Sequence, residues 1–263
     1  MLYALLTLLL SLGAAPSCVA SVGLPLPHIQ ESAHIQLFCT DVDIVEASLI
    51  LQQSEALYAQ LSADFQSSPS TKMQLRVYPR IEDFHKEIGS PLAPDWCVGN
   101  VTHSEDYKSS FYQVVSPRNP GPAHTRASIM RCLAVGVTEL FMSAIFQKRL
   151  PRWLYQGVAL YKAKYEGSAE ELSSMANNAT TLPGIVQLES IDDKAFASMH
   201  GFRCSYSLVD FICTKWGWET VRALLQDYAS FEHIVQLSKD EFSTQWRTFF
   251  ANKYGHPSVP MLG

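Results

Sequence analysis

The segment from Arg126 to Gln147 constrains the fold most, because it is a long, largely apolar stretch that reads as one helix. A helix that is apolar on most sides is stable only when other elements bury it, so this segment is expected to be a core helix. A short break follows, and a second helix is predicted from Pro151 to Tyr165. The chain has 263 residues, 47% of them hydrophobic, which is enough to build a core around this pair in one large domain or two modest ones.

The residues before this helix pair alternate between strand and helix patterns. Residues 34–40 alternate in the strand manner, with Ile35, Leu37 and Cys39 on one face. A long amphipathic helix is predicted over residues 41–65, with Asp41 as its N-cap. Further strands are predicted over residues 72–79, 97–102 and 109–116, with a short helix over residues 81–89. The first half is therefore expected to be a small α+β unit.

The residues after the helix pair favour helices. Residues 168–184 are polar and are predicted to be irregular, whereas helices are expected over residues 206–216, 218–228 and 239–254. The last of these carries an apolar stripe that we interpret as core: Phe242, Trp246, Phe249 and Phe250. The predicted fold class is α+β, with a small N-terminal mixed sheet and helices followed by a mostly helical C-terminal half. The predicted divisions are a signal peptide (1–20), a lead-in (21–33), a single domain (34–254, with halves 34–117 and 122–254) and a tail (255–263).

The first twenty residues are typical of a secretory signal peptide. An apolar run from Leu2 to Leu12 precedes small residues, and the triplet ending at Ala20 suits cleavage after that residue. An uncleaved anchor and a lipoprotein modified at Cys18 are the alternatives. The run is shorter than the roughly 20 residues that a membrane-spanning helix needs, and no later segment is expected to span a membrane. A secreted, periplasmic or cell-envelope location is therefore predicted.

Charge and cysteine content narrow the function further. The net charge of -5 argues against a nucleic-acid binder, which normally carries a basic patch. The cysteines left after signal cleavage are consistent either with one or two disulfides plus a free thiol or with buried thiols throughout: Cys39, Cys97, Cys132, Cys204 and Cys213. Asn100 and Asn178 each begin an Asn-x-Thr sequon, which has meaning only in a source that glycosylates.

The helix pair resembles that of the gluzincin zinc peptidases, in particular the group called peptidase MA-like. Those thermolysin-like enzymes carry HExxH on one helix and a segment close to LPRWLSEGLA on the next. Here the second segment reads LPRWLYQGVALY (Leu150–Tyr161), and the first falls on VGVTELF (Val135–Phe141). The resemblance extends over roughly residues 34–254 through the order of the surrounding strands and helices. It implies a gluzincin-like fold with a cleft between an edge strand and the motif helix.

The residue types at the motif positions do not suit zinc chemistry. Such a site needs two histidines at i and i+4, a carboxylate from the next helix and a glutamate that activates the bound water. The resemblance places Val135 and Glu139 at the two histidines, Gly136 at the general base and Gln156 at the carboxylate ligand. Valine and glycine have no ligating side chain, and the amide of glutamine is a weak zinc ligand. We therefore expect no bound metal or other cofactor, since the zinc is expected to be lost, and a degenerate site without catalytic residues.

The remaining polar residues offer no replacement site. The histidines and acids considered, His85, His103, Glu105, His124, His200 and His233, do not form an HxxxH pair. A cysteine protease that pairs Cys132 or Cys97 with His124 is not excluded, but no residue pattern supports it. Glu139 needs a buried partner, for which Arg152 or Lys148 is predicted. Gly136 fits either a position released from catalysis or one that needs close backbone approach.

These observations predict a secreted pseudo-peptidase that holds an extended peptide or protein segment in its cleft. The candidate cleft residues are Thr138, Glu139, Trp153, Tyr155 and Gln156. No nucleic acid is expected as a partner. The alternatives are an active metallohydrolase with non-standard ligands and a structural envelope protein without a cleft function.

Overall fold

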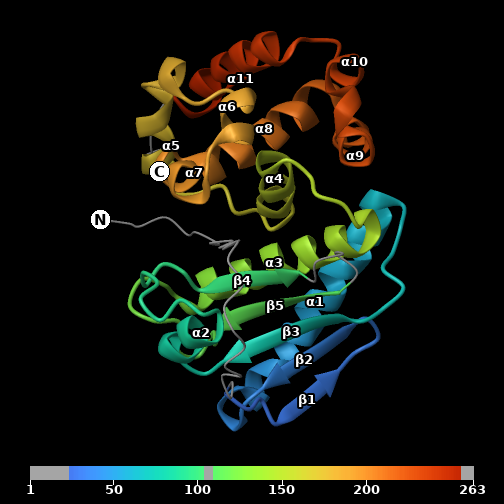
Figure 1. Ribbon diagram of the computed structural model, residues 1–263, viewed down its shortest axis with the longest axis vertical. Helices are drawn as coiled ribbons and strands as arrows, with labels where there is room; N and C mark the ends of the chain where they lie inside the picture. Colours follow the sequence, from blue (N-terminus) through green and yellow to red (C-terminus); the bar gives the residue numbers. More distant parts are fainter. Residues whose placement is uncertain (1–23, 104–108, 256–263) are drawn as a thin grey trace, which may run out of the picture. The chain divides into compact units, whose positions relative to one another are not determined.

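The computed structural model describes residues 24–103 and 109–255, which fold into two compact units that divide between Lys148 and Arg149 (Figure 1). Strands occur in the first unit and helices in both, so the predicted α+β class is confirmed. The expected signal peptide (1–20) and most of the tail lie outside the described residues, as does Glu105. The division differs from the predicted halves because the long apolar helix belongs to the unit that contains the sheet. A single domain over 34–254 stays a prediction.

The first unit is built on a five-stranded mixed sheet with the strand order β1-β2-β3-β5-β4. The strands are β1 (His28–Glu31), β2 (Ile35–Cys39), β3 (Met73–Tyr78), β4 (Gly99–His103) and β5 (Ser110–Val115). The three central strands β2, β3 and β5 are parallel, while β1 and β4 are antiparallel to their neighbours. The predicted pairing of the segments around residues 97–102 and 109–116 is confirmed by the β4–β5 pair.

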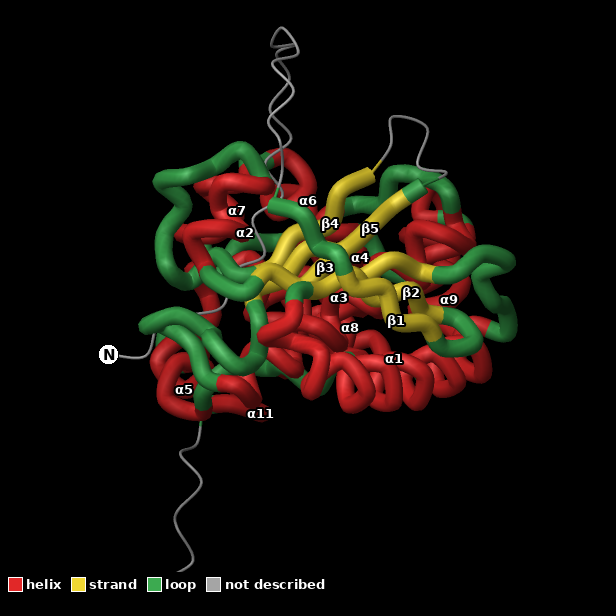
Figure 2. The backbone as a smooth tube through the Cα atoms, turned by 90° about the horizontal axis from the view of Figure 1, so that it is seen from below, coloured by secondary structure: helices red, strands yellow, loops and turns green. Residues whose placement is uncertain are grey.

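Two long helices, α1 (Ile44–Phe65) and α3 (Arg126–Phe146), lie on the same face of this sheet and contact each other (Figure 2). The predicted inward face of β2 is confirmed, because Ile35, Leu37 and Cys39 are fully buried. The short helix α2 (Ile81–Glu87) contacts β3 and β5. Alternation along the strands therefore places apolar residues under α1 and α3 and mainly polar ones on the opposite face.

Two details of the first unit correct the sequence analysis. The lead-in was expected to precede the domain, but it contains β1, a short edge strand with only one strongly apolar residue, Ile29. Asp41 is not the N-cap of the long helix. It begins the 3-10 helix η1 (Asp41–Asp43) and pairs with the ring of His28, and α1 starts only after Asp43.

The α3 helix also corrects an expectation about membranes. By length and composition alone it is long and apolar enough to cross a membrane, contrary to the expectation that no segment after the N-terminal run would be. However, 67% of its most apolar window is buried inside the structure. This burial is typical of a core helix in a soluble protein, and such a helix is weak evidence for a span.

The second unit is helical. Its helices are α4 (Arg152–Lys162), α5 (Ala169–Ala176), α6 (Ile185–Ser190), α7 (Asp193–Ser198), α8 (Gly201–Trp216), α9 (Trp218–Gln226), α10 (Phe231–Val235) and α11 (Lys239–Tyr254), with 3-10 helices η2 (Ala179–Thr181) and η3 (Tyr228–Ser230). The expectation of an irregular excursion over residues 168–184 is wrong for its first part, where Ser168 caps α5 through the Glu171 N–H. The core role predicted for the apolar stripe of α11 is confirmed for Phe242, Trp246 and Phe250, which are fully buried, whereas Phe249 is half-buried.

Asp43 follows β2, and its carboxyl group is fully buried. It lies against Ser116, the residue that follows β5. The Ser116 hydroxyl donates a hydrogen bond to its Oδ1, and the Thr40 hydroxyl lies 3.4 Å from its Oδ2. Burial raises the pKa of Asp43, and the hydrogen bonds from Ser116 and Thr40 oppose this effect without cancelling it. The ionised form is therefore less favourable in the folded chain than in water.

We expect Asp43→Asn to become relatively more stable as the pH rises. Because the folded-state pKa of Asp43 is raised, its stabilising contribution is present below the unfolded-state pKa and is lost as the pH rises through the folded-state pKa. An amide at this position does not titrate. Urea unfolding of both proteins between about pH 4 and about pH 7 measures the difference. Asp95→Asn, at an exposed carboxylate, is the control. If the difference in unfolding free energy between Asp43→Asn and the unaltered protein does not change with pH, the expectation is wrong.

Candidate functional site

The first half of the predicted site lies in the middle of α3. This helix begins at Thr125, whose side chain forms a capping box with Ser128. The motif positions Val135, Gly136 and Glu139 and the cleft candidate Thr138 are all buried. The Thr138 hydroxyl donates to the carbonyl of Ala134 on its own helix, at 2.9 Å. All four positions are therefore inaccessible to solvent, and the helix that carries them contacts β4 and β5.

Gly136 faces the ring of Tyr112 on β5. A Cβ atom at position 136 would lie 2.3–2.4 Å from three ring carbons of Tyr112, far inside van der Waals contact. Gly99 on β4 meets the other end of the same side chain, because a Cβ there would lie 2.0 Å from the Tyr112 hydroxyl oxygen. A neighbour does approach Gly136 closely, but it is the side chain of Tyr112 and not the backbone that was predicted; release from catalysis stays a prediction. Tyr112 fills the space into which a side chain at 136 would project.

Glu139 is fully buried in the same region. Burial raises the pKa of Tyr112 well above its usual value, with smaller contributions from Cys132, Glu139 and Cys97. Among the described residues, the Tyr112 hydroxyl has no hydrogen-bond partner. These groups thus form a small polar cluster inside the first unit, and of its members only Glu139 belongs to the predicted zinc motif. Arg152 or Lys148 as the partner of Glu139 stays a prediction.

The second half of the predicted site lies on α4, in the second unit. Trp153 was predicted to line a cleft, but it is fully buried within this unit. Its ring packs against Tyr228, Phe231 and Phe242 at centroid distances of 6.0–6.4 Å. Its indole N–H donates to the Tyr228 hydroxyl at 3.0 Å. The tryptophan of the LPRWL segment is therefore a core residue, and its assignment to a binding cleft is corrected.

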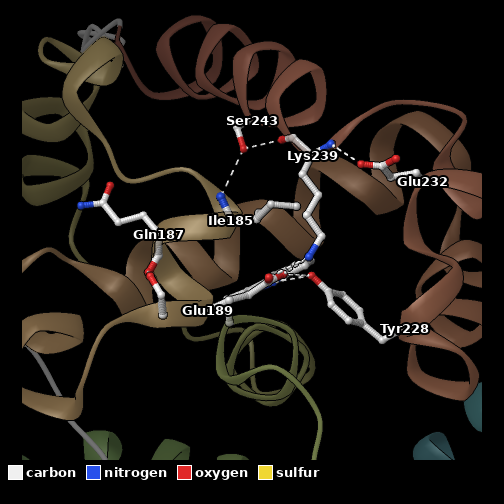
Figure 3. A network of polar contacts seen from close by, with 9 residues as sticks. Ile185, Gln187, Glu189, Tyr228, Glu232, Lys239 and Ser243 are labelled. Carbon is white, nitrogen blue, oxygen red and sulfur yellow. Dashed lines mark hydrogen bonds and ion pairs between the residues drawn. The ribbon is translucent and has the colours of Figure 1, made fainter.

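A polar network holds Tyr228 in place (Figure 3). The Tyr228 hydroxyl donates to the carboxylate of Glu189 on α6, and the ammonium of Lys239 on α11 lies 2.7 Å from the same carboxylate. Burial and the neighbouring Glu189 raise the pKa of Tyr228. Trp153 is thus tied through Tyr228 to two other helices of its unit. This explains why a tryptophan suits position 153 without invoking a ligand.

Gly157 explains another part of the LPRWLYQG segment. A Cβ at this position would lie 2.3 Å from the carbonyl oxygen of Ser205 and 2.8 Å from a methyl group of Val209, both on α8. The backbones of α4 and α8 therefore pack directly against each other at this point. Gln156 beside it is buried, and Tyr155 is half-buried. Val135, Gly136 and Glu139 lie in the first unit and Gln156 in the second, so their convergence stays a prediction.

Four of the histidines considered as metal ligands have other local contacts. The ring of His103 lies 2.8 Å from the Ser110 hydroxyl, and that of His85 lies 2.8 Å from the carbonyl of Cys97. His124 contacts the Trp96 carbonyl at 3.1 Å, and His200 lies 3.8 Å from Glu171. Within residues 24–103 and 109–255, no group of three or more His, Cys, Asp or Glu side chains could hold a metal ion.

The cysteines are mostly buried. Cys39, Cys132 and Cys204 are buried free thiols, Cys97 is also buried, and Cys213 is half-buried. Burial raises the pKa of the Cys39 thiol to about 11 and that of Cys204 to about 12, so both stay protonated at neutral pH. Of the two explanations given for the cysteines, the structure supports buried thiols that pack as small apolar groups. Burial also raises the pKa of Cys132, so a thiolate nucleophile at this candidate partner of His124 is not supported.

Comparison with known proteins does not identify a family for this chain. No family model matches the chain, and no curated protein matches its sequence. The resemblance to peptidase MA-like enzymes therefore rests on the LPRWLYQGVALY segment and on the order of elements around it.

Proposed function

We propose that this protein is a secreted zinc-peptidase homologue without catalytic activity that binds an extended peptide or protein segment. The binding element is the outer edge of β4. The observation that carries this proposal is the position of β4 as an antiparallel edge strand beside the motif helix α3. Strands in this position can accept another chain through main-chain hydrogen bonds.

The hydrogen bonds of the β4–β5 pair show which groups face outward. The Val115 N–H donates to the Val98 carbonyl, so residues 98 and 115 form a hydrogen-bonded pair. Such pairs alternate along an antiparallel ladder, so Asn100 bonds with Gln113. The N–H and C=O groups of Gly99 and Val101 consequently point away from β5. Among the described residues, no strand pairs with this edge.

The two faces of β4 differ, which would give a bound segment a defined orientation. The side chain of Val101 and the Cα of Gly99 are buried on the α3 side, whereas Asn100 and Thr102 lie on the polar face. An added strand would continue both faces, placing alternate side chains beside α3 and beside the polar face. This arrangement favours a segment with alternating apolar and polar residues.

The absence of catalysis is supported by the side chains at the motif positions. Val135 has no ligating atom, and the Tyr112 ring occupies the space next to Gly136. A general base at 136 would be needed to activate a metal-bound water. Metal analysis and a generic peptidase assay on residues 21–263 test this part of the proposal. Stoichiometric zinc together with peptide cleavage would establish the alternative, an active metallohydrolase.

Strand addition predicts that Val101→Pro abolishes peptide capture. Proline removes the outward N–H of Val101 and is tolerated at the edge of a sheet. The probe is a library of short peptides with alternating apolar and polar residues, captured on immobilised protein. We expect at least a tenfold loss of binding for this variant, which is about 1.4 kcal/mol.

Ile29→Pro is the matched control on the opposite edge. The Ser32 N–H donates to the Ile35 carbonyl, so by the same alternation the N–H of Ile29 faces outward from β1. Ile29→Pro should bind the captured peptides as the unaltered protein does. Peptides with N-methylated alternate amides should lose binding while keeping their side chains. Equal capture by the two proline variants would rule out β4 as the binding edge.

A further inference from the structure

Two Asn-x-Thr sequons occur in the chain, one in each unit, and their surroundings differ. We propose that Asn178 carries an N-linked oligosaccharide in the secreted protein and that Asn100 does not. The proposal concerns a modification site; it rests on the secretion included in the proposed function, but not on peptide binding at β4.

Asn178 lies on the surface of the second unit, in the turn between α5 and η2. Asn178 and Thr180 are exposed, while Ala179 between them is buried. The Asn178 side-chain amide makes one long hydrogen bond, 3.4 Å to the carbonyl of Ser174. N-linked transfer leaves one hydrogen on this nitrogen, so the contact with Ser174 survives modification. A saccharide at this turn extends into solvent.

Asn100 lies in β4 and is held on the polar face of the sheet. Its side-chain nitrogen donates to the Thr102 hydroxyl oxygen at 3.2 Å and to Oε1 of Gln113 at 3.4 Å. Gln113 is buried and donates in turn to the Tyr78 hydroxyl at 3.3 Å. A glycan on Asn100 would remove one of the two donated hydrogen bonds and force a bulky polar group against Gln113. A folded unit that keeps both donated hydrogen bonds therefore carries no glycan at this sequon.

The transfer uses an oligosaccharide carried on a polyprenyl pyrophosphate and an oligosaccharyltransferase. The amide nitrogen of Asn178 forms a bond to the anomeric carbon of the first sugar. The bond between that carbon and the pyrophosphate oxygen breaks, the polyprenyl pyrophosphate leaves, and the amide nitrogen loses one proton. Thr180 supplies the hydroxyl that the sequon requires.

The test expresses residues 21–263 behind a host signal peptide in eukaryotic cells that glycosylate Asn-x-Thr. We expect an electrophoretic shift that peptide N-glycosidase removes. The enzyme converts the modified asparagine to aspartate, and mass spectrometry then places the change at position 178. The proposal would be overturned if the secreted protein showed no shift, or if the enzyme produced the new aspartate at position 100.

Matched variants separate loss of the sequon from loss of folding. Asn178→Gln and Thr180→Ala should both abolish the shift, whereas Thr180→Ser keeps the sequon and should retain it. Asn100→Gln should leave the shift unchanged. A shift that persists in Thr180→Ala, or that disappears in Asn100→Gln, contradicts the assignment to Asn178.

Discussion

Gly136→Ala is expected to lower the free energy of unfolding by about 2 kcal/mol, although alanine is the better helix former by about 1 kcal/mol. The added Cβ would lie 2.3–2.4 Å from the ring of Tyr112, which is itself fully buried between β4, β5 and α3. Neither the ring nor the helix can move without disturbing the core of the first unit. Urea unfolding followed by circular dichroism measures the loss.

Two comparisons isolate the contact as the cause. At the exposed position Arg131 of the same helix, the alanine variant should be more stable than the glycine variant by about 1 kcal/mol. In a Tyr112→Val background the ring is absent, so Gly136→Ala should no longer destabilise the protein. A Gly136→Ala variant as stable as the unaltered chain would show that Tyr112 does not press against the helix at this position.

This contact bears on the proposed loss of catalysis. The resemblance to zinc peptidases assigns the general base to position 136, and glutamate there would add both a Cβ clash and a buried charge. A single substitution at 136 would therefore damage the fold before it could contribute to chemistry.

The sequence predicted the elements with strong periodicity. The alternation of Ile35, Leu37 and Cys39 identified β2 and its buried face, and the apolar run after Thr125 identified α3. It missed β1 because an edge strand of four residues with a single apolar side chain has no detectable period. It missed α5 because that helix depends on its Ser168 cap within a polar segment.

The candidate site could be predicted only in part. Residue types were enough to judge that Val135 and Gly136 lack ligating atoms, since that conclusion depends on chemistry alone. The burial of Trp153 could not be read from the sequence, because tryptophan serves equally well in a core and in a binding cleft. Tyr112 was missed for a related reason. Its role depends on Gly136, which is distant in the sequence and contacts it only in the folded unit.

Gly157→Ala is expected to have a larger effect than Gly136→Ala, a loss of about 3 kcal/mol in the free energy of unfolding. The Cβ would lie 2.3 Å from a backbone carbonyl oxygen of Ser205 and 2.8 Å from its carbonyl carbon. A side chain can rotate away from such a clash, but a helix backbone cannot. The α4 helix would have to move away from α8, loosening the packing between the two helices.

Gly89→Ala provides a scale for the effect of backbone conformation alone. Gly89 has a φ of 70°, and a Cβ added there would meet no atom within 4 Å. Gly89→Ala should therefore lower the free energy of unfolding by about 1 kcal/mol, because alanine disfavours the left-handed conformation. Gly157 has a helical conformation, so the stability lost in Gly157→Ala arises from the contact with Ser205. Tryptophan fluorescence during urea unfolding follows the unit of Gly157, because Trp153 and Trp246 are both fully buried there. Circular dichroism follows the helices of both units and so also reports the effect of Gly89→Ala in the first unit. A Gly157→Ala variant that loses less stability than Gly89→Ala would show that α4 and α8 are not in backbone contact. The glycine of the LPRWLYQG segment would then need an explanation other than packing.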